Sequence, residues 1–196
     1  MWVLTVDQRD SRLVGDRVAD LIAGMPVVAG VVRPAERTVG DELQLVLDQG
    51  RETVDLALHL LRVGGWSIGI GAGPVDEPLP ASAREASGQA FILAREAVEA
   101  AKGRHRSVPL AVRGADPAAA SDAEAVLALI GVTMARRTPA GWQVADLAAA
   151  GEGQAAVARR LGITVQAVSQ RLRTALWAEE VAARPAAARL LTAAAG

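Results

Sequence analysis

Residues 154–175, QAAVARRLGITVQAVSQRLRTA, decide how the C-terminal part of the chain folds. The stretch predicts two short helices joined by a tight turn at Gly162, because glycine readily takes the positive φ that ends a helix. Thr164 is a favourable N-cap for the second helix. Apolar residues recur at helical spacing along one side of each helix, so the helices are expected to share a core. These residues are Val157, Ala158 and Leu161 in the first helix, Ile163 in the turn, and Val168, Leu172 and Leu176 in the second helix.

The opposite side of the second helix is polar and contains no acidic residue. Glutamine pairs well with adenine and arginine with guanine in the major groove, while other arginines can bind phosphates. We therefore expect a helix-turn-helix that lays its second helix in the major groove of double-stranded DNA. An ordinary helical hairpin in an alanine-rich domain is the competing interpretation. The candidate DNA-contacting residues are Thr164, Gln166, Ser169, Gln170, Arg171, Arg173, Arg159 and Arg160.

The composition limits the class of protein. A length of 196 residues suggests one or two domains. A net charge of −1 excludes a protein that coats nucleic acid through bulk positive charge, so any DNA contact requires a local basic patch. The absence of cysteine excludes disulfides and agrees with a cytoplasmic location, and two histidines are too few for a multi-histidine metal site. We expect no signal peptide and no membrane-length apolar run.

The first 114 residues alternate between patterns of strands and patterns of helices. Strands are expected at 2–7, 26–33, 42–48, 66–71 and 107–113, and helices at 11–24, 50–63 and 82–102. Strands that alternate with helices imply a sheet with helices packed on it. The adjacent strand pair in the middle of this order is typical of a ferredoxin-like or palm domain.

The strand patterns stop after Gly114, and Asp116-Pro117 is the expected domain boundary. The remainder is expected to be helical at about 119–133, 141–149, 154–161, 165–182 and 186–194, with Pro185 separating the last two helices. We therefore predict an α/β (α+β) protein with two domains. A palm domain at 1–114 is followed by an all-α domain at 117–196, with the helix-turn-helix at 154–175.

Two aspartates at expected strand ends are candidate metal ligands. Asp7 ends the first strand, and Asp41 lies at the hairpin in the segment TVGDEL. In a palm fold these places are neighbours on the sheet, and paired carboxylates can hold Mg²⁺, which in turn binds phosphates. The alternative is that both aspartates only terminate strands.

The start of the first helix is a candidate anion site. Ser11 or Asp10 can cap this helix, and a helix N-terminus beside Arg12 suits a negatively charged group. Plain helix capping is the alternative interpretation of the same residues.

Four segments of the N-terminal domain together resemble two related groups of proteins. The segments are Asp7 followed by QRDSR, VGDE at 39–42, SIGIGAGPV at 67–75 and GQAFILAREAVEAAK at 88–102. They resemble the SatD family of small prokaryotic proteins and the class III nucleotidyl cyclase domain, over roughly residues 2–113. Cyclases carry a metal-binding aspartate after the first strand and another in a Gly-Asp at the hairpin. The resemblance therefore implies a palm fold, a metal site at Asp7 and Asp41, and a nucleotide site that includes Gly40.

The chain departs from the cyclase pattern on the long helix. Cyclases place there an asparagine and an arginine, which orient the ribose and stabilise the transition state. By register from Gly88 these positions are Ile92 and Glu96, which cannot do that work, and Arg95 is one place away. We therefore expect no cyclic nucleotide synthesis and assign no catalytic residue.

These observations lead to one preferred function and two alternatives. We expect a cytoplasmic DNA-binding transcription regulator whose palm domain senses a nucleotide with Mg²⁺. The expected nucleotide-binding residues are Ser11, Arg12 and Gly40, and the expected metal ligands are Asp7 and Asp41. Cyclase-type palm domains pair head-to-tail and helix-turn-helix proteins bind as two-fold dimers, so we expect a homodimer. The alternatives are an enzyme acting on nucleoside triphosphates with a DNA-targeting domain, and a ligand-free dimeric DNA-binding protein.

Overall fold

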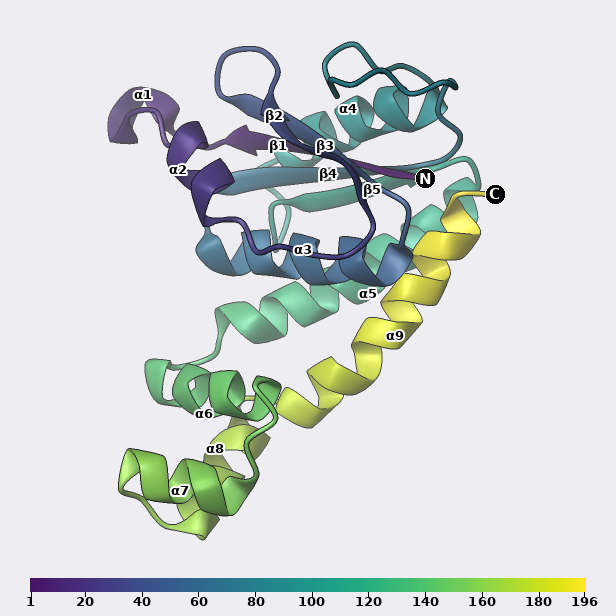
Figure 1. Cartoon of the computed structure of the whole chain (residues 1–196). Helices are drawn as coiled ribbons and strands as arrows, with labels where there is room; N and C mark the ends of the chain where they lie inside the picture. Colours follow the sequence, from purple (N-terminus) through teal and green to yellow (C-terminus); the bar gives the residue numbers. More distant parts are fainter. The chain divides into compact units, whose positions relative to one another are not determined.

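The computed structural model describes every residue from Met1 to Gly196. It shows a mixed α+β protein with one five-stranded mixed sheet and nine helices (Figure 1), and this confirms the predicted class. The chain forms two compact units. Unit 1 comprises Met1–Ala128 and Arg184–Gly196, and unit 2 comprises Leu129–Ala183.

The division into units differs from the boundary expected at residues 114–117. Helices α5 (Pro117–Ala135) and α9 (Trp177–Ala194) each contribute to both units, because the chain passes from one unit to the other within them. The sequence pattern changes from strands to helices where the last strand ends, and this change predicts a boundary there. Nothing in the helical pattern itself indicates that its first and last segments belong to the unit that contains the sheet.

The sheet of unit 1 has one parallel and three antiparallel strand pairs. Its strands are β1 (Trp2–Gln8), β2 (Val31–Arg37), β3 (Glu42–Leu47), β4 (Trp66–Ala72) and β5 (Leu110–Gly114), in the order β2-β3-β1-β4-β5. β1 pairs antiparallel with β3 and β4, and β2 pairs antiparallel with β3. Only β5 runs parallel to its neighbour, β4. β3 therefore lies between β1 and β2, although it follows both in the sequence.

Each face of the sheet is covered by a helix (Figure 1). Helix α3 (Gly50–Val63) packs against β1, β3 and β4, and α4 (Gln89–Ala101) packs against β1, β4 and β5. Side chains alternate along each strand, so both faces receive apolar residues. Val3 and Val46 form one core cluster with residues of α4, while Leu4 points to the other face and is fully buried.

Two glycines allow α4 to lie directly on β4. A Cβ atom at Gly69 would lie 2.5 Å from the carbonyl oxygen of Ala94, and one at Gly71 would lie 2.8 Å from the Cα of Ala94. Both separations are shorter than the optimal contact between non-bonded atoms. Any larger residue would therefore force the helix away, so the glycine-rich SIGIG pattern has a packing role in this protein.

Two expected elements at the start of the chain have different limits. The strand expected at 26–33 is β2, five residues later, which forms an edge of the sheet. Pro34 is tolerated in it because an edge strand leaves some backbone groups unpaired. The helix expected at 11–24 is broken, because Gly15 takes φ 79°. It separates α1 (Ser11–Val14) from α2 (Val18–Gly24).

The helix expected at 82–102 begins only at Gln89, because the preceding segment is bonded to β2. The carboxylate of Glu36 accepts hydrogen bonds from Ser82 Oγ (2.6 Å) and from the backbone N–H of Ala83 (2.8 Å). The hydrogen bond from Ser82 is the main reason that the pKa of Glu36 is lowered. These long-range bonds hold the segment in a non-helical conformation.

A second set of bonds holds the same segment on β2. Arg33 donates to the carbonyl oxygens of Leu79 (2.7 Å) and Pro80. We call residues 73–88, which connect β4 to α4, the strap. The strap crosses the part of the sheet that α4 does not cover, since Arg33 and Glu36 belong to the edge strand β2.

The last part of α9 belongs to unit 1. Trp2 Nε1 donates to the carbonyl oxygen of Leu191 (2.9 Å), and Arg184 forms an ion pair with Asp55 of α3 (2.6 Å). The break expected at Pro185 is absent, because α9 runs through this residue. A proline removes one helical hydrogen bond, and the packing of α9 on unit 1 offsets that loss.

Unit 2 contains α6 (Pro139–Ala149), α7 (Gln154–Leu161) and α8 (Val165–Thr174). The limits of α7 are those predicted, but the helix expected at 165–182 ends at Thr174. Leu176 takes φ 50° and is 44% exposed, so the expectation that it points inward is wrong. The three helices share a core of Val144, Val157, Ala158 and Val168, with Leu147, Leu161, Ile163 and Leu172 packed against it.

Helix α5 is long and apolar enough to cross a membrane by length and composition, with a mean hydropathy of 1.5. The expectation that the chain has no such run is therefore wrong. A core helix of a soluble protein has the same character. Glu124, within α5, forms ion pairs with Arg106 (2.7 Å) and Arg113 (3.1 Å). Because these charged contacts come from the sheet-containing unit, we interpret α5 as a helix of a soluble protein.

Candidate functional site

The turn between α7 and α8 is built from local hydrogen bonds. Gly162 takes φ 65° and ψ 32°, which ends α7 as predicted. The backbone N–H of Ile163 donates to the carbonyl oxygen of Ala158 (3.0 Å). Thr164 Oγ1 accepts from the backbone N–H of Ala167 (3.1 Å), so Thr164 is the N-cap of α8. These bonds fix the direction in which α8 leaves the turn.

Helix α8 presents a polar face to solvent. Four of its predicted DNA-contacting side chains are exposed, and two, Ser169 and Arg171, are half-buried. Within this face Arg173 Nη1 donates to Gln170 Oε1 (3.3 Å). The exposed four are Thr164, Gln166, Gln170 and Arg173. The face therefore offers hydrogen-bond donors and acceptors. These groups can replace their bonds to water, or to each other, by bonds to a ligand.

Arg159 and Arg160 lie in the last turn of α7, and both are exposed. Arg160 Nη1 lies 2.5 Å from Glu152 Oε1. An exposed ion pair of this kind contributes little to stability. Arg160 can therefore leave Glu152 for a phosphate, but Arg159 forms no such pair and is the more available cation.

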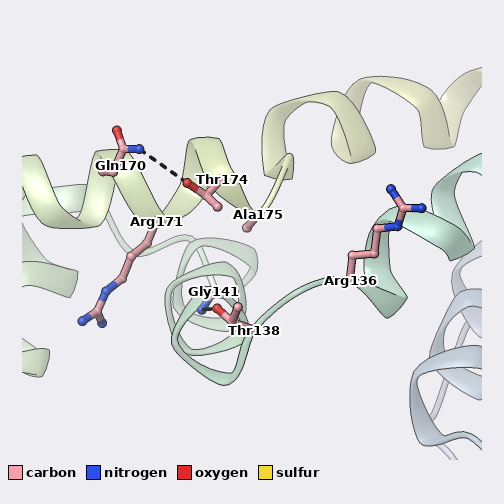
Figure 2. A pocket seen from close by; sticks show the side chains of 7 residues that line it. All are labelled: Arg136, Thr138, Gly141, Gln170, Arg171, Thr174 and Ala175. Atoms are coloured by element: carbon pink, nitrogen blue, oxygen red, sulfur yellow. Dashed lines mark hydrogen bonds between the residues drawn. The ribbon is translucent and has the colours of Figure 1, made fainter.

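A hollow of about 130 Å³ lies between the start of α6 and the end of α8 (Figure 2). Thr138 Oγ1 accepts from the backbone N–H of Gly141 (3.1 Å) at its base. Figure 2 shows the guanidinium groups of Arg136 and Arg171 on opposite sides of the hollow, directed away from each other. Two cations that diverge in this way suit two separate anionic groups better than one small anion. Arg136 was not among the predicted residues, because it precedes the helix pair in the sequence.

Arg137 is buried beside the end of α8. Its Nη2 lies 2.5 Å from Glu180 Oε2, and both side chains are almost fully buried, with 0% and 1% exposed. Nε and Nη2 also donate to the carbonyl oxygen of Ala175 (3.2 and 2.9 Å). The guanidinium lies 4.4 Å from the ring centre of Trp142 and 5.9 Å from that of Trp177. Arg137 thus binds the carbonyl oxygen of Ala175, the C-cap of α8, although the sequence contains no pattern that identifies it.

The structure brings Asp7 and Asp41 together as predicted. The backbone N–H of Gln8 donates to the carbonyl oxygen of Asp41 (3.1 Å), which places the end of β1 beside the β2–β3 hairpin. Lys102 Nζ lies 3.1 Å from Asp7 Oδ2 and 2.7 Å from Glu99 Oε1. The pKa of Asp7 is raised, and burial is the largest cause. The nearby carboxylates of Asp41 and Glu99 also raise it, whereas Lys102 lowers it. The pKa of Lys102 is raised too, because the two carboxylates outweigh its burial.

The carboxylates of Asp7 and Asp41 could balance the charge of a bound cation, but the ammonium group of Lys102 already supplies a positive charge. Mg²⁺ prefers oxygen ligands in octahedral geometry. No group of three or more histidine, cysteine, aspartate or glutamate residues could hold a metal ion. Ser67 Oγ, opposite Asp7 on β4, is a buried oxygen with no hydrogen-bond partner. A metal ion at Asp7 and Asp41 would have to displace the ammonium group of Lys102 and complete its shell from ligand and water.

The three predicted nucleotide-binding residues lie at two separate turns. Ser11 and Arg12 belong to α1, a helix of four residues, and no hydrogen bond from a capping side chain is formed at its start. Asp10 occupies the N-cap position, as one of the two predicted alternatives, but it takes φ 56° and its side chain forms no capping hydrogen bond. Gly40, at the hairpin, takes φ 62°, and its carbonyl oxygen accepts from Arg37 Nη1 (3.1 Å).

A polar hollow lies over β3, between the strap and α4. Its volume is about 350 Å³. The residues that line this β3 hollow are Thr38, Val39, Glu42, Gln44, Arg84 and Arg95. Ile92 is 60% exposed and Glu96 lines a different hollow, beside Arg113 and Glu124, so neither belongs to this one. Arg84 was not a predicted site residue, because only the strap brings it here.

Comparison with known proteins finds no match to the chain among family models, curated proteins or solved structures. The resemblance to SatD proteins and cyclases therefore stays a prediction.

Proposed function

We propose that this protein is a DNA-binding transcription regulator whose unit 1 senses a nucleotide. The observation that carries the proposal is the exposed polar face of α8, which contains no acidic residue and is mounted on the core of α6, α7 and α8. A short first helix, a turn capped at Gly162 and Thr164, and an exposed second helix match the helix-turn-helix plan. Gln166 and Gln170 suit adenine, and Arg173 suits guanine.

The charge distribution supports the same proposal. Unit 2 contains six arginines and four carboxylates, so its net charge is +2, whereas the whole chain carries −1. Positive charge that is concentrated on one unit attracts DNA without making the whole protein basic. Arg136, Arg159 and Arg171 are the cations that we assign to phosphates.

For unit 1 we propose a palm fold of the cyclase type. The antiparallel order β2-β3-β1-β4, with helices after β1 and β3, follows the ferredoxin-like plan, and β5 extends it by one parallel strand. This plan, together with Asp7 beside the Gly40–Asp41 turn, supports a nucleotide ligand with Mg²⁺. The metal ion would supply positive charge for the phosphates, in place of the ammonium group of Lys102.

We further propose a cytoplasmic homodimer that binds a two-fold operator. Helix-turn-helix dimers present their second helices to half-sites about 34 Å apart. The test is selection of random DNA duplexes on the full-length protein. We expect an enriched sequence with two-fold symmetry, and recovery of no preferred sequence would rule out the regulator.

Variants of α8 make the test specific. Gln170→Ala and Arg173→Ala should each weaken binding to the selected sequence by about 1–3 kcal/mol and relax the preference at one position. Arg159→Ala should weaken binding to all sequences alike. The matched control is Arg104→Ala, an exposed arginine of unit 1, which should leave DNA affinity unchanged.

One observation favours a second function. Lys102 forms an ion pair with Asp7 and so neutralises this carboxylate at the expected metal site. A unit that serves only to form the dimer would need no metal ion there. Calorimetry with nucleoside triphosphates and Mg²⁺ separates the two functions, because a scaffold shows no heat of binding. Assay of the same mixtures for a product tests the enzyme alternative.

A further inference from the structure

The β3 hollow has a built wall on each side. Its floor is β3, whose residues Glu42 and Gln44 point to the face that α4 covers. One wall is α4, which lies in close contact with β4 at Gly69 and Gly71. The other wall is the strap, which carries Arg84. Bonds from β2 hold the strap immediately before that residue, at Leu79, Ser82 and Ala83.

The bonds of Glu36 to the strap place Arg84 over the hollow. The carboxylate of Glu36 is occupied by Ser82 Oγ and by the backbone N–H of Ala83, the residues immediately before Arg84. The backbone N–H of Arg84 in turn donates to Ser82 Oγ (3.2 Å). The main chain is therefore fixed up to Arg84, while its side chain is exposed.

The two arginines in the hollow have no bonded partner. Arg84 and Arg95 line it from opposite walls, and neither guanidinium forms a hydrogen bond or an ion pair. By contrast, Arg33 is hydrogen-bonded to the strap and Arg106 to Glu124 of α5. Arginine presents a planar fork of donors that matches phosphate oxygens. Two such groups over one hollow attract an anion.

The floor of the hollow carries acceptors in fixed positions. Thr38 Oγ1 donates to Glu42 Oε1 (2.6 Å), and Gln44 Nε2 donates to Thr5 Oγ1 (3.0 Å). These bonds orient the remaining Glu42 and Gln44 oxygens. Such oxygens accept hydrogen bonds from hydroxyl or amino groups. A ligand that fills the hollow therefore needs donors as well as a negative charge.

We propose that the β3 hollow binds a phosphorylated small molecule, whose phosphate is held by Arg84 and Arg95 and whose hydroxyl or amino groups are held by Glu42 and Gln44. The volume of about 350 Å³ lies in the range of small-molecule sites and suits a nucleoside monophosphate. The inference rests on the sensing part of the proposed function. It goes further in assigning the phosphate to arginines, so that binding needs no metal ion.

The test is calorimetry of the full-length protein in excess EDTA, with AMP, GMP and inorganic phosphate as probes. We expect saturable binding of at least one nucleotide, and weaker binding of inorganic phosphate, because it lacks the donors for Glu42 and Gln44. Arg84→Gln and Arg95→Gln should each weaken nucleotide binding about tenfold or more, since each removes a charge-assisted pair of hydrogen bonds. Both side chains are exposed, so the variants should keep the thermal midpoint of the wild type.

Arg51→Gln is the matched control, because Arg51 is an exposed arginine at the start of α3, on the other face of the sheet. It should leave nucleotide affinity unchanged. Absence of binding to all three probes overturns the inference, and so do arginine variants that bind like the wild type. Asp41→Asn separates this site from the metal site. Unchanged binding by Asp41→Asn in EDTA, with loss in the arginine variants, supports the β3 hollow even where the metal proposal fails.

Discussion

Arg137 is the residue on which the position of the α8 face most depends. It is buried, it holds the carbonyl oxygen of Ala175 at the end of α8, and it neutralises Glu180. A buried ion pair is costly to form, but removal of one partner costs more, since the other charge stays in a medium of low dielectric constant. Single residues of this kind set the geometry of a binding face without touching the ligand.

Arg137→Ala should therefore lower the free energy of unfolding by about 3–5 kcal/mol. Urea unfolding followed by tryptophan fluorescence measures this loss, because Trp142 and Trp177 flank the guanidinium. The double variant Arg137→Met with Glu180→Leu removes both charges and should recover a large part of the stability. Arg136→Ala changes a neighbouring exposed arginine and should have little effect. A single variant as stable as the wild type would contradict this role.

Glu124 makes the stability of unit 1 depend on pH. Burial alone would raise its pKa, but the backbone N–H of Val112 and the guanidinium groups of Arg106 and Arg113 outweigh burial, so the pKa is lowered from its ordinary value of 4.5. The unfolded chain then takes up the proton before the folded chain does. The stability that Glu124 contributes is therefore complete above the pKa of the unfolded chain. It is lost as the pH falls through the pKa of the folded chain.

Glu124→Gln should lower the free energy of unfolding at neutral pH by about 1–3 kcal/mol, because it weakens hydrogen bonds from charged groups. It should also flatten the fall in stability below pH 4.5. Thermal unfolding over a pH series measures both effects. Asp122→Asn, an exposed change on the same helix, is the control and should follow the wild type. Parallel pH curves for Glu124→Gln and the wild type would refute the assignment.

At the scale of elements, the seating of α4 on β4 is the contact that shapes unit 1. Gly71→Ala should lower the free energy of unfolding by about 1–3 kcal/mol, because an added methyl group overpacks the helix–sheet contact. Chemical denaturation measures the loss, and nucleotide affinity should fall with it, since α4 forms one wall of the β3 hollow. Gly24→Ala is the control, because nothing lies within 4 Å of a Cβ at that position. Equal stability of the two variants would contradict a close helix–sheet contact.

Elements fixed by local chemistry could be predicted from the sequence, and those fixed by distant contacts could not. The limits of α7 follow from Gly162, which ends it, and the start of α8 follows from its cap at Thr164. The start of α4 depends instead on Glu36, which bonds the strap from another strand. At Pro185 the local chemistry predicts a helix break, but packing keeps α9 continuous through this residue.

The same distinction applies to the candidate sites. The neighbourhood of Asp7 and Asp41 follows from strand order, which the alternating pattern reveals. Lys102 and Arg84 could not be assigned, because they reach their sites through the end of α4 and through the strap. Sites that are assembled by irregular segments require the structure.

At the scale of the whole molecule, sensing requires that the ligand changes DNA affinity. A ligand shifts DNA binding only through different affinities for two states of the protein, and the coupling is reciprocal. DNA that carries the operator should therefore change nucleotide affinity by the same factor by which the nucleotide changes operator affinity. A protein whose unit 1 only forms the dimer shows no coupling in either direction.

Asp41→Asn should abolish the Mg²⁺-dependent part of nucleotide binding and its effect on DNA, while metal-independent binding in the β3 hollow and operator affinity without ligand stay at the wild-type values. The reason is that Asp41 lies beside Asp7 in unit 1, whereas the proposed DNA-contacting residues belong to unit 2. Calorimetry measures nucleotide binding, and fluorescence anisotropy of a labelled operator measures DNA binding with and without nucleotide. Asp20→Asn, an exposed change on α2, controls for loss of one negative charge. Unchanged nucleotide affinity in both Asp7→Asn and Asp41→Asn would return these aspartates to the role of strand ends.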